Sequence, residues 1–347
     1  MGILIISIIV LLLSFYMLNE VTDRFFVPSL DKIAEKLKMS DDAAGATLMA
    51  AGSSAPELFV AIIALSSGDN FDIGIGTIVG SALFNLLVIV GTIGLVRKST
   101  VAWQPMLRDI IFYVISIGLL YWAYSSGHIS MVHVALFIGV YVLYIIAVVY
   151  WRKLLPHNEF RDDIEEEEDE DPNWKKHFRF LDFILEKLFA PEKYFGINFF
   201  ISIVLIAGLS WVLVESAVHI SEVLEVPKYI IGLTILAFGT SVPDMISSII
   251  VAKQGRGGMA ISNALGSNIF DILIGLGLPW LVLILMNKTG IDVNTDEISH
   301  HILVLLESVV GMLILFLITG WRVNRFVGVL MIGFYLLYLI SVIFSVS

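Results

Sequence analysis

The stretch that decides the fold is Gly52-Ser53-Ser54-Ala55-Pro56-Glu57, followed by Gly80-Ser81-Ala82-Leu83-Phe84-Asn85. The second half of the chain repeats both motifs as Gly239-Thr240-Ser241-Val242-Pro243-Asp244 and Gly266-Ser267-Asn268-Ile269-Phe270-Asp271. The offset between the copies is 187 residues from Glu57 to Asp244 and 186 residues from Asn85 to Asp271. Carboxyl groups repeated beside helix-breaking Gly and Pro, in segments apolar enough to lie in a membrane, indicate an ion site built twice.

The composition is typical of an integral membrane protein. Hydrophobic residues make up 58% of the 347 residues, and the mean hydropathy is +0.90. A helix needs about 20 apolar residues to cross a bilayer. The first apolar run has no basic residues before it and no small-residue cleavage site, so we expect a retained helix rather than a signal peptide. We expect an all-α protein with ten spans, at residues 2–18, 42–66, 73–96, 107–125, 130–151, 197–218, 228–252, 259–286, 301–320 and 326–346.

The basic residues predict the orientation of these spans. Of the 21 Lys and Arg residues, all except Lys228 and Lys288 fall on one side of the predicted membrane. By the positive-inside rule that side is cytoplasmic, so both termini are extracytoplasmic. Five spans in each half is an odd number, so the second half enters the membrane upside down relative to the first. We therefore expect two inverted five-helix repeats, residues 1–151 and 197–347, joined by a cytoplasmic loop of residues 152–196.

The joining loop is the one long polar insertion in the sequence. It contains an unbroken acidic run from Glu165 to Asp171. Such a run is typical of a solvated linker, and a cation-collecting or regulatory segment is the alternative. The stretch from Trp174 to Phe189 has apolar residues at helical spacing after a basic start, which predicts an amphipathic helix at the inner membrane surface or an ordinary connecting helix.

The motifs place oxygen-bearing side chains one helical turn apart. Residues four apart lie on one face of a helix, and this spacing joins Ser53 with Glu57, Ser81 with Asn85, Thr240 with Asp244, and Ser267 with Asp271. All of these side chains offer oxygen, which suits hard cations such as Ca²⁺ and Na⁺ rather than Zn²⁺ or Cu⁺. The chain has no cysteine, which excludes disulfides, thiolate metal sites and cysteine nucleophiles.

Helix breakers beside the acids add backbone oxygens to the expected site. Pro56 and Pro243 lack the N–H that would bond the carbonyl four residues earlier. Carbonyl groups released within a bilayer need another partner, and a bound cation is one. We expect the carbonyls of Ala50 and Ala237, just before the two motifs, to point inward as well.

The charges of the motif acids explain how exchange could work. Glu57, Asp244 and Asp271 supply three carboxyl groups within predicted spans. Each isolated charge at that depth is costly. Ca²⁺ with K⁺ would neutralise three negative charges, as would three Na⁺ or bound protons. If such cation sets compete for one pocket, loading by one expels the other.

Together these motifs resemble the two repeats of the cation/calcium antiporter superfamily, and within it the potassium-dependent sodium/calcium exchanger family. The resemblance is densest over residues 26–94 and 231–280. It implies that Glu57 and Asp244 are central Ca²⁺ ligands and that Asp271 is tied to K⁺. It also implies that Asn85 completes the ring of ligands around the ions, and that spans 1 and 6 slide across the other helices. The hydroxyl ligands that the resemblance implies are those of Ser53, Ser54, Ser81, Thr240, Ser241 and Ser267.

The expected function is Na⁺/Ca²⁺ antiport with K⁺ co-transport across a plasma (inner) membrane, by a protein that is not an enzyme. We expect Ca²⁺, Na⁺, K⁺ and lipid as partners, with no cofactor and no nucleic acid. The alternatives are a proton/calcium exchanger of the same fold, a potassium-independent exchanger, a passive channel, and an intramembrane hydrolase using Asp244 with Asp271. Glu215 and Glu307 lie within spans and are expected either on the ion path or in buried hydrogen bonds.

Overall fold

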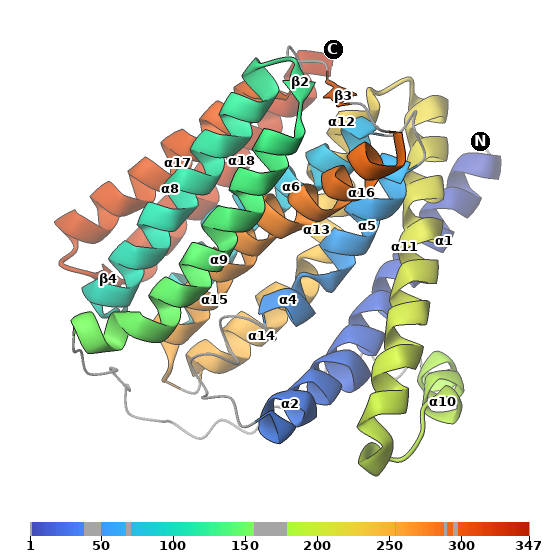
Figure 1. The fold of residues 1–347 in the computed structure, drawn as a ribbon, viewed down its shortest axis with the longest axis horizontal. Coiled ribbons are helices and arrows are strands. Elements are labelled where there is room, and N and C mark those ends of the chain that lie inside the picture. Colours follow the sequence, from blue (N-terminus) through green and yellow to red (C-terminus); the bar gives the residue numbers. More distant parts are fainter. Residues whose placement is uncertain are drawn as a thin grey trace.

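The computed structural model describes residues 2–37, 50–66, 71–155, 179–253, 255–287, 290–293 and 298–346. Within these ranges almost all of the chain is helical (Figure 1). Eight helical stretches are long and apolar enough to cross a membrane: Leu4–Leu30, Phe71–Val96, Trp103–Ser125, Met131–Trp151, Phe195–Leu224, Gly257–Met286, Ser299–Ile318 and Arg325–Phe344. A ninth candidate is the pair Lys228–Thr240 and Val242–Lys253, which is bent by 43°.

The helices of the first half follow one another with short connections. They are α1 (Gly2–Val21), α2 (Val27–Lys36), α4 (Ala50–Ser53), α5 (Ala55–Ser66), α6 (Phe71–Phe84), α7 (Val90–Val96), α8 (Trp103–Ser125) and α9 (Met131–Leu154). Two π-helical turns join neighbouring helices, η1 (Thr22–Phe26) between α1 and α2 and η3 (Asn85–Ile89) between α6 and α7.

The second half has a closely similar series of elements. They are α10 (Arg179–Leu188), a 3-10 turn η5 (Glu192–Tyr194), α11 (Phe195–Leu224), α12 (Lys228–Ile231), α13 (Ala237–Thr240), α14 (Val242–Lys253), α15 (Gly257–Phe270), α16 (Gly277–Asn287), α17 (Ser299–Ile318) and α18 (Arg325–Val346). Here the π-helical turns are η6 (Gly232–Leu236), before α13, and η7 (Asp271–Leu276), between α15 and α16.

Helices α1 and α11 lie side by side at one edge of the bundle (Figure 1). Their buried apolar residues form a cluster separate from the main core, and the rings of Phe26 and Phe199 stack within it at 5.4 Å between centroids. The larger cluster fills the space among the other helices, with Tyr113, Phe137 and Trp280 fully buried. The described residues therefore form two apolar cores, the smaller of which joins the α1–α11 pair to α5 and other neighbouring elements.

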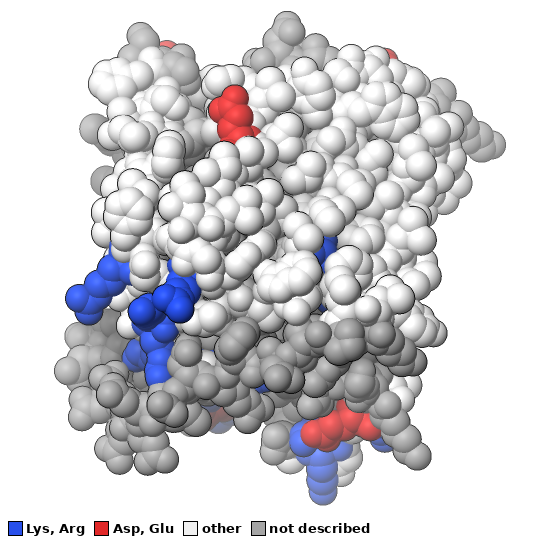
Figure 2. Space-filling model, turned by 90° about the vertical axis from the view of Figure 1, so that its left-hand side faces the viewer, with Lys and Arg blue, Asp and Glu red and all other residues white. Residues whose placement is uncertain are grey.

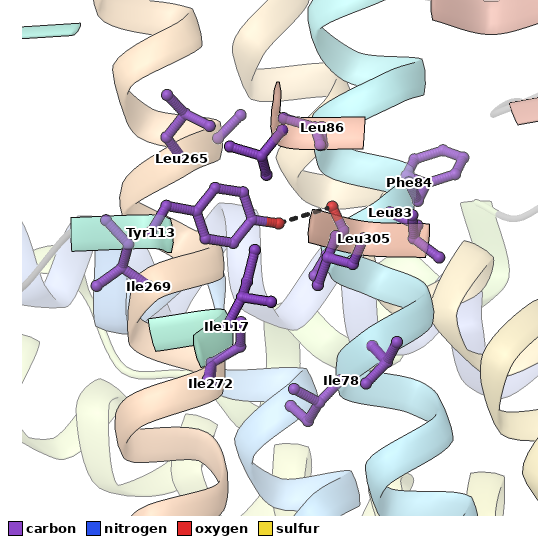
Figure 3. Packing of buried hydrophobic residues seen from close by; sticks show 14 of the residues in the cluster. Ile78, Leu83, Phe84, Leu86, Tyr113, Ile117, Leu265, Ile269, Ile272 and Leu305 are labelled. Atoms are coloured by element: carbon purple, nitrogen blue, oxygen red, sulfur yellow. Dashed lines mark hydrogen bonds between the residues drawn. The ribbon is translucent and has the colours of Figure 1, made fainter. Parts of the chain in front are cut away.

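Figure 3 shows the larger core around Tyr113 of α8. Its ring lies in a cluster that includes aliphatic side chains of α6, α15 and α17, among them Leu83, Ile269 and Leu305. The hydroxyl group donates to the carbonyl of Ala82 at 3.3 Å, which gives the buried polar atom a partner. This contact ties α8 to α6 beside one of the two motifs.

Two short antiparallel strand pairs lie at opposite ends of the bundle (Figure 1). Strand β1 (Ser99–Thr100) pairs with β4 (Arg322–Val323), and β2 (His128–Ile129) pairs with β3 (Ile291–Asp292). Both chain termini lie at the end that holds β2 and β3, whereas α10 lies at the other end (Figure 1). The face in Figure 2 has a broad uncharged band, and its Lys and Arg atoms gather in the lower half.

The structure corrects one sequence-based expectation about the first helix. The first apolar helix does not end near residue 18 but runs from Leu4 to Leu30 through the π turn η1. Residues 31–36 form the end of α2, which continues that same helix. Residues 42–49 of the second predicted span, and the acidic run from Glu165 to Asp171, lie outside the described residues.

Candidate cation site

The first motif interrupts a helix at the same place in both halves. Helix α4 ends at Ser53 and α5 begins at Ala55, while α13 ends at Thr240 and α14 begins at Val242. The break falls at Ser54 in one copy and at Ser241 in the other. In each case the next helix carries a proline at its second position, where a missing N–H is tolerated. The acid of the motif, Glu57 or Asp244, then lies in the first turn of the second helix.

Serines from the two halves pair reciprocally across the site. The hydroxyls of Ser54 and Ser267 lie 2.5 Å apart, and those of Ser81 and Ser241 lie 2.6 Å apart. In both pairs a serine at the helix break of one half meets the serine of the second motif in the other half. All four residues have no exposed surface. The structure therefore brings four predicted site residues together in two equivalent contacts.

Two motif acids receive matching hydrogen bonds. The Ser267 hydroxyl donates to Asp244 Oδ2 at 3.0 Å, and the corresponding Ser81 hydroxyl makes a longer contact of 3.4 Å with Glu57 Oε1. Ser241 also donates to Glu57 Oε1, at 3.5 Å. Glu57 and Asp244 are completely buried and cannot be solvated by bulk water. Their hydrogen bonds come from serine hydroxyls of the second motif in the same half and, for Glu57, also from the other half.

Other carboxyl and amide oxygens at the site have no partner among the described residues. These are Oε2 of Glu57, Oδ1 of Asn85 and both carboxyl oxygens of Asp271. A buried polar atom left unsatisfied costs about 1–3 kcal/mol, and more when it is charged. Buried oxygen atoms that receive no hydrogen bond are therefore suited to bind a cation.

The second motif ends where each helix widens into a π turn. The turn η3 begins at Asn85 and η7 begins at Asp271, so the two equivalent residues start equivalent irregular turns. A π turn inserted into an α-helix often lies at a functional site, because it redirects side chains and weakens local backbone bonding. Asn85 and Asp271 are both fully buried.

The remaining predicted ligands lie at the same two helix breaks. The Ala50 carbonyl accepts from the backbone N–H of Ser54 at 3.1 Å and from the Ser53 hydroxyl at 3.3 Å. The Ala237 carbonyl accepts from Ser241 N–H at 3.2 Å and, at 3.5 Å, from Thr240 Oγ1. A carbonyl oxygen has two lone pairs, yet both of these oxygens already serve the local backbone. Thr240 is buried and Ser53 is partly exposed.

No group of three or more Asp, Glu or His side chains in the described ranges is arranged to hold a metal ion by itself. The carboxyl groups of Glu57 and Asp244 are instead hydrogen-bonded by serine hydroxyls, and the amide of Asn85 lies beside Asp244. A cation in this site would therefore need hydroxyl, amide and backbone oxygens as well, which is the ligand set that Ca²⁺ and Na⁺ accept.

Two residues at the site were missed by the sequence reasoning, Asn268 and Tyr113. The amide nitrogen of Asn268 donates to the Tyr113 hydroxyl at 2.9 Å and to the Ala82 carbonyl at 3.0 Å. Its side-chain oxygen accepts from Asn85, whose nitrogen also lies 3.4 Å from Asp244 Oδ2. Asn268 could have been noticed because it replaces the Ala82 of the first copy. Tyr113 lies in no motif, so no sequence pattern pointed to it.

A second buried polar cluster lies nearby on α8. Asp109 is fully buried and pairs with Arg108 at 2.8 Å, and it accepts from the hydroxyls of Tyr144 and Ser262. Because these partners come from α8, α9 and α15, the cluster fastens three helices together. Asp109 and Tyr113 are four residues apart on α8, and both contact α15, the helix that carries Ser267.

The other acids expected within spans are placed differently. Glu215 is partly buried on α11, and Glu307 lies on an exposed face of α17. Glu307 is therefore neither in a buried hydrogen bond nor among the site residues described above.

His133 accepts from the backbone N–H of Ser130 at 3.0 Å and so caps the start of α9.

Comparisons with known proteins agree with this architecture. The sequence profile of the sodium/calcium exchanger protein family matches residues 6–150 and 195–344. The human protein sodium/potassium/calcium exchanger 5 is 30% identical, over 96% of this chain and 82% of its own length. Sodium/potassium/calcium exchanger 2 of Gallus gallus is 28% identical, over 98% of this chain and 77% of its own length.

A solved structure of the sodium-calcium exchanger NCX_Mj, soaked with 10 mM Na⁺ and zero Ca²⁺, has the same fold. Its TM-score is 0.60 at 23% identity, with 97% of this chain and 99% of that chain covered. The profile match alone spans most of both halves of the sequence. This chain belongs to the sodium/calcium exchanger protein family.

Proposed function

We propose that this chain is an antiporter that exchanges Na⁺ for Ca²⁺ across a membrane and carries K⁺ together with Ca²⁺. The observation that carries the proposal is the meeting of both motif copies at one buried site with unsatisfied carboxyl and amide oxygens. The names of the relatives, sodium/potassium/calcium exchangers, support the same set of ions. Carboxyl, hydroxyl and amide oxygens are the ligands that these cations accept.

The proposed architecture is ten spans in two inverted repeats, residues 1–151 and 197–347, joined by residues 152–196. Two reciprocal arrangements support it. Each helix-break serine meets the second-motif serine of the other half. Similarly, the first strand of each half, β1 or β3, pairs with the second strand of the other half, β4 or β2, and the two pairs lie at opposite ends (Figure 1). A two-fold axis in the membrane plane relates elements in this way.

In this arrangement both termini are extracytoplasmic and the joining loop is cytoplasmic, in a plasma (inner) membrane. Both ends of the chain lie on one side of the bundle and α10 on the other (Figure 1). The clustering of Lys and Arg atoms in the lower half of Figure 2 fits the positive-inside rule.

The proposed ion ligands fall into three groups, two of carboxyl groups and one of neutral oxygens. Glu57 and Asp244 hold Ca²⁺ at the centre, and Asp271 serves K⁺. Neutral oxygens complete the shells of Ca²⁺ or Na⁺, from Asn85 and the backbone of Ala50 and Ala237, together with the hydroxyls of Ser53, Ser54, Ser81, Thr240, Ser241 and Ser267. Because the same three carboxyl groups serve each cation set, binding of Na⁺ displaces Ca²⁺ and K⁺, and exchange follows.

The test is uptake of radiolabelled Ca²⁺ into proteoliposomes loaded with Na⁺, with external K⁺ present or replaced by choline. Uptake that requires both internal Na⁺ and external K⁺ is the expected result. Uptake that requires internal Na⁺ but not external K⁺ would support Na⁺/Ca²⁺ antiport and contradict the co-transport of K⁺. Absence of Na⁺-dependent uptake in either medium would contradict the proposal, and uptake driven by a pH gradient would then identify a proton-coupled exchanger.

A further inference from the structure

Asp109 is a fully buried carboxyl group on α8 that takes no part in the cation site described above. Unlike Glu57 and Asp271, it has a donor for each of its oxygens. Arg108 bonds one oxygen through Nε and Nη2, each at 2.8 Å, and the other oxygen accepts from the Ser262 hydroxyl. A carboxyl group whose partners are all supplied by the protein has no oxygen left for a cation. Its role must therefore lie in the elements that it holds together.

Asp109 and its partners hold α15 just before the second motif of that helix. Ser262, which donates to Asp109, lies five residues before Ser267. The Tyr144 hydroxyl on α9 donates to Asp109 at 3.2 Å, and a Cβ atom at Gly266 would lie 3.3 Å from the same hydroxyl oxygen. Because Ser262 and Gly266 are one helical turn apart, both contacts lie on one face of α15.

Contacts along one face of a helix fix its rotation about its own axis. Successive residues of an α-helix point about 100° apart, since 3.6 residues make one turn. A rotation of α15 would therefore turn Ser267 and Asp271 away from the site together. The Ser267 hydroxyl lies 2.5 Å from that of Ser54 and 3.0 Å from Asp244 Oδ2, and these contacts require one particular rotation.

The two halves hold their second motifs by different means. At the motif offset of 186 residues, the counterpart of Ser262 on α6 is Gly76, which has no side chain to donate a hydrogen bond. A Cβ atom at Gly76 would lie 2.4 Å from the carbonyl oxygen of Tyr229, so α6 is held by close backbone packing. The hydrogen-bonded contact with Asp109 therefore belongs to the half that carries Asp271.

We propose that Asp109 is a positioning residue, which fixes the rotation of α15 through Ser262 and thereby sets the affinity of the site for Ca²⁺ and K⁺. Arg108 supplies the opposite charge that a buried carboxylate within a bilayer requires. Polar networks whose members are all satisfied are rigid, which suits a positioning role. The effect on ion affinity rests on the proposed function, whereas the fixed rotation of α15 does not depend on it.

The rotation of α15 is tested by a disulfide across the site. The chain has no cysteine, and Ser54→Cys with Ser267→Cys replaces two hydroxyls that lie 2.5 Å apart. Adding Ser262→Ala should slow oxidation of this pair by at least about fivefold, because it removes the hydrogen bond to a charged group. Ser116→Ala is the matched control, since the Ser116 hydroxyl is buried and donates to Phe112 of its own helix. The control should oxidise at the unaltered rate.

Na⁺-driven Ca²⁺ uptake tests the consequence for the ions. In a protein without the cysteines, Ser262→Ala should raise the external Ca²⁺ and K⁺ concentrations for half-maximal uptake by at least about fivefold. The maximal rate should stay within about twofold, and Ser262→Thr, which keeps the hydroxyl, should restore both concentrations. A purely structural role would lower the maximal rate and the unfolding midpoint without changing the half-maximal concentrations, and that result would overturn the proposal.

Tyr144→Phe removes the other hydroxyl donor of Asp109, and it is the second variant if Ser262→Ala fails to fold. It should slow disulfide formation and weaken ion dependence in the same way. Equal oxidation of the cysteine pair with and without these changes would overturn the proposal, whatever the transport result. Absence of Ca²⁺ uptake by the unaltered protein would count against the proposed function alone, because slower oxidation would still show that α15 had turned.

Discussion

At the scale of single residues, Glu57 and Asp271 hold the carboxyl oxygens that the chain itself leaves unsatisfied. Oε2 of Glu57 and both oxygens of Asp271 are buried without a donor among the described residues. Glu57 is the only acid in the first copy of the two motifs. We predict that Glu57→Gln abolishes Ca²⁺ transport, because the amide keeps the shape and removes the charge. Near-normal Ca²⁺ uptake by this variant in vesicles would remove Glu57 from the site.

Asp271 differs from its counterpart Asn85 by one charge, and this difference suggests a selective test. In Asp271→Asn both copies carry an amide at this position, so the site loses the charge proposed for K⁺. We expect Na⁺/Ca²⁺ exchange to continue with little or no activation by K⁺. The measurement is Na⁺-driven Ca²⁺ uptake over a series of external K⁺ concentrations. K⁺ activation identical to that of the unaltered protein would exclude Asp271 from K⁺ binding.

Tyr113 should act on the site through Asn268 rather than by touching an ion. Tyr113→Phe removes the hydroxyl that accepts from Asn268 and donates to Ala82. Loss of a buried hydrogen bond costs about 1–2 kcal/mol, so we predict a rise of roughly 5–30-fold in the Ca²⁺ concentration for half-maximal uptake. The maximal rate should change much less.

Tyr124→Phe is the control for that substitution. Tyr124 is also fully buried, but its hydroxyl has no hydrogen-bond partner among the described residues. Its removal should leave the Ca²⁺ dependence of uptake unchanged. Equal effects of the two tyrosine variants would mean that Tyr113 contributes only to packing.

At the scale of helices, Gly76 and Gly80 allow α6 to approach the backbone of the bent span of the other half. A Cβ atom at Gly80 would lie 2.2 Å from the carbonyl oxygen of Leu233, and at Gly76 it would lie 2.4 Å from that of Tyr229. Because the contacting atoms belong to the backbone, a change of side-chain rotamer cannot relieve the clash. The close contact holds the second motif of the first half against the helix that leads to Thr240.

We therefore predict that Gly80→Ala lowers thermal stability, since overpacking of this kind costs about 1–3 kcal/mol or more. Gly118→Ala is the matched control, because a Cβ atom there meets nothing within 4 Å. That change should be neutral or slightly stabilising. The measurement is the unfolding midpoint of each variant in the same detergent. Equal midpoints for the two variants would show that α6 can shift away from Leu233 at no cost.

Much of this helical organisation could be predicted from the sequence. Length and hydropathy predict most of the spans, because a bilayer demands long apolar helices. Which side of each helix faces lipid and which faces the interior could not be predicted, because both sides are equally apolar. The position of Glu307 on the outside of α17 was therefore missed. The serine pairs and the role of Tyr113 were also missed, because they depend on contacts between helices far apart in sequence.

At the scale of the whole molecule, α1 and α11 pack together in the smaller apolar cluster, which also includes residues of α5, α6 and η6, the part that carries the site. Movement of this pair relative to the other helices is what the family resemblance implies for spans 1 and 6. Its contact with the site is close: a Cβ atom at Gly239 would lie 2.1 Å from the ring of Phe15 on α1. The ring therefore covers the helix that ends at Thr240, and any sliding of the pair must carry it away from Gly239.

We predict that a covalent link between these two positions stops transport. In the double variant Phe15→Cys with Gly239→Cys, loss of the ring makes room for the new side chain, and a short, reducible thiol cross-linker joins the pair to the site. We expect Na⁺-driven Ca²⁺ uptake to fall at least tenfold on cross-linking and to recover on reduction. The control is Phe26→Cys with Phe199→Cys, which replaces two rings stacked within the moving unit. Its cross-linking should leave uptake within about twofold, because it joins parts that move together. Full uptake by the completely cross-linked 15–239 variant would mean that transport proceeds without movement of α1 past Gly239.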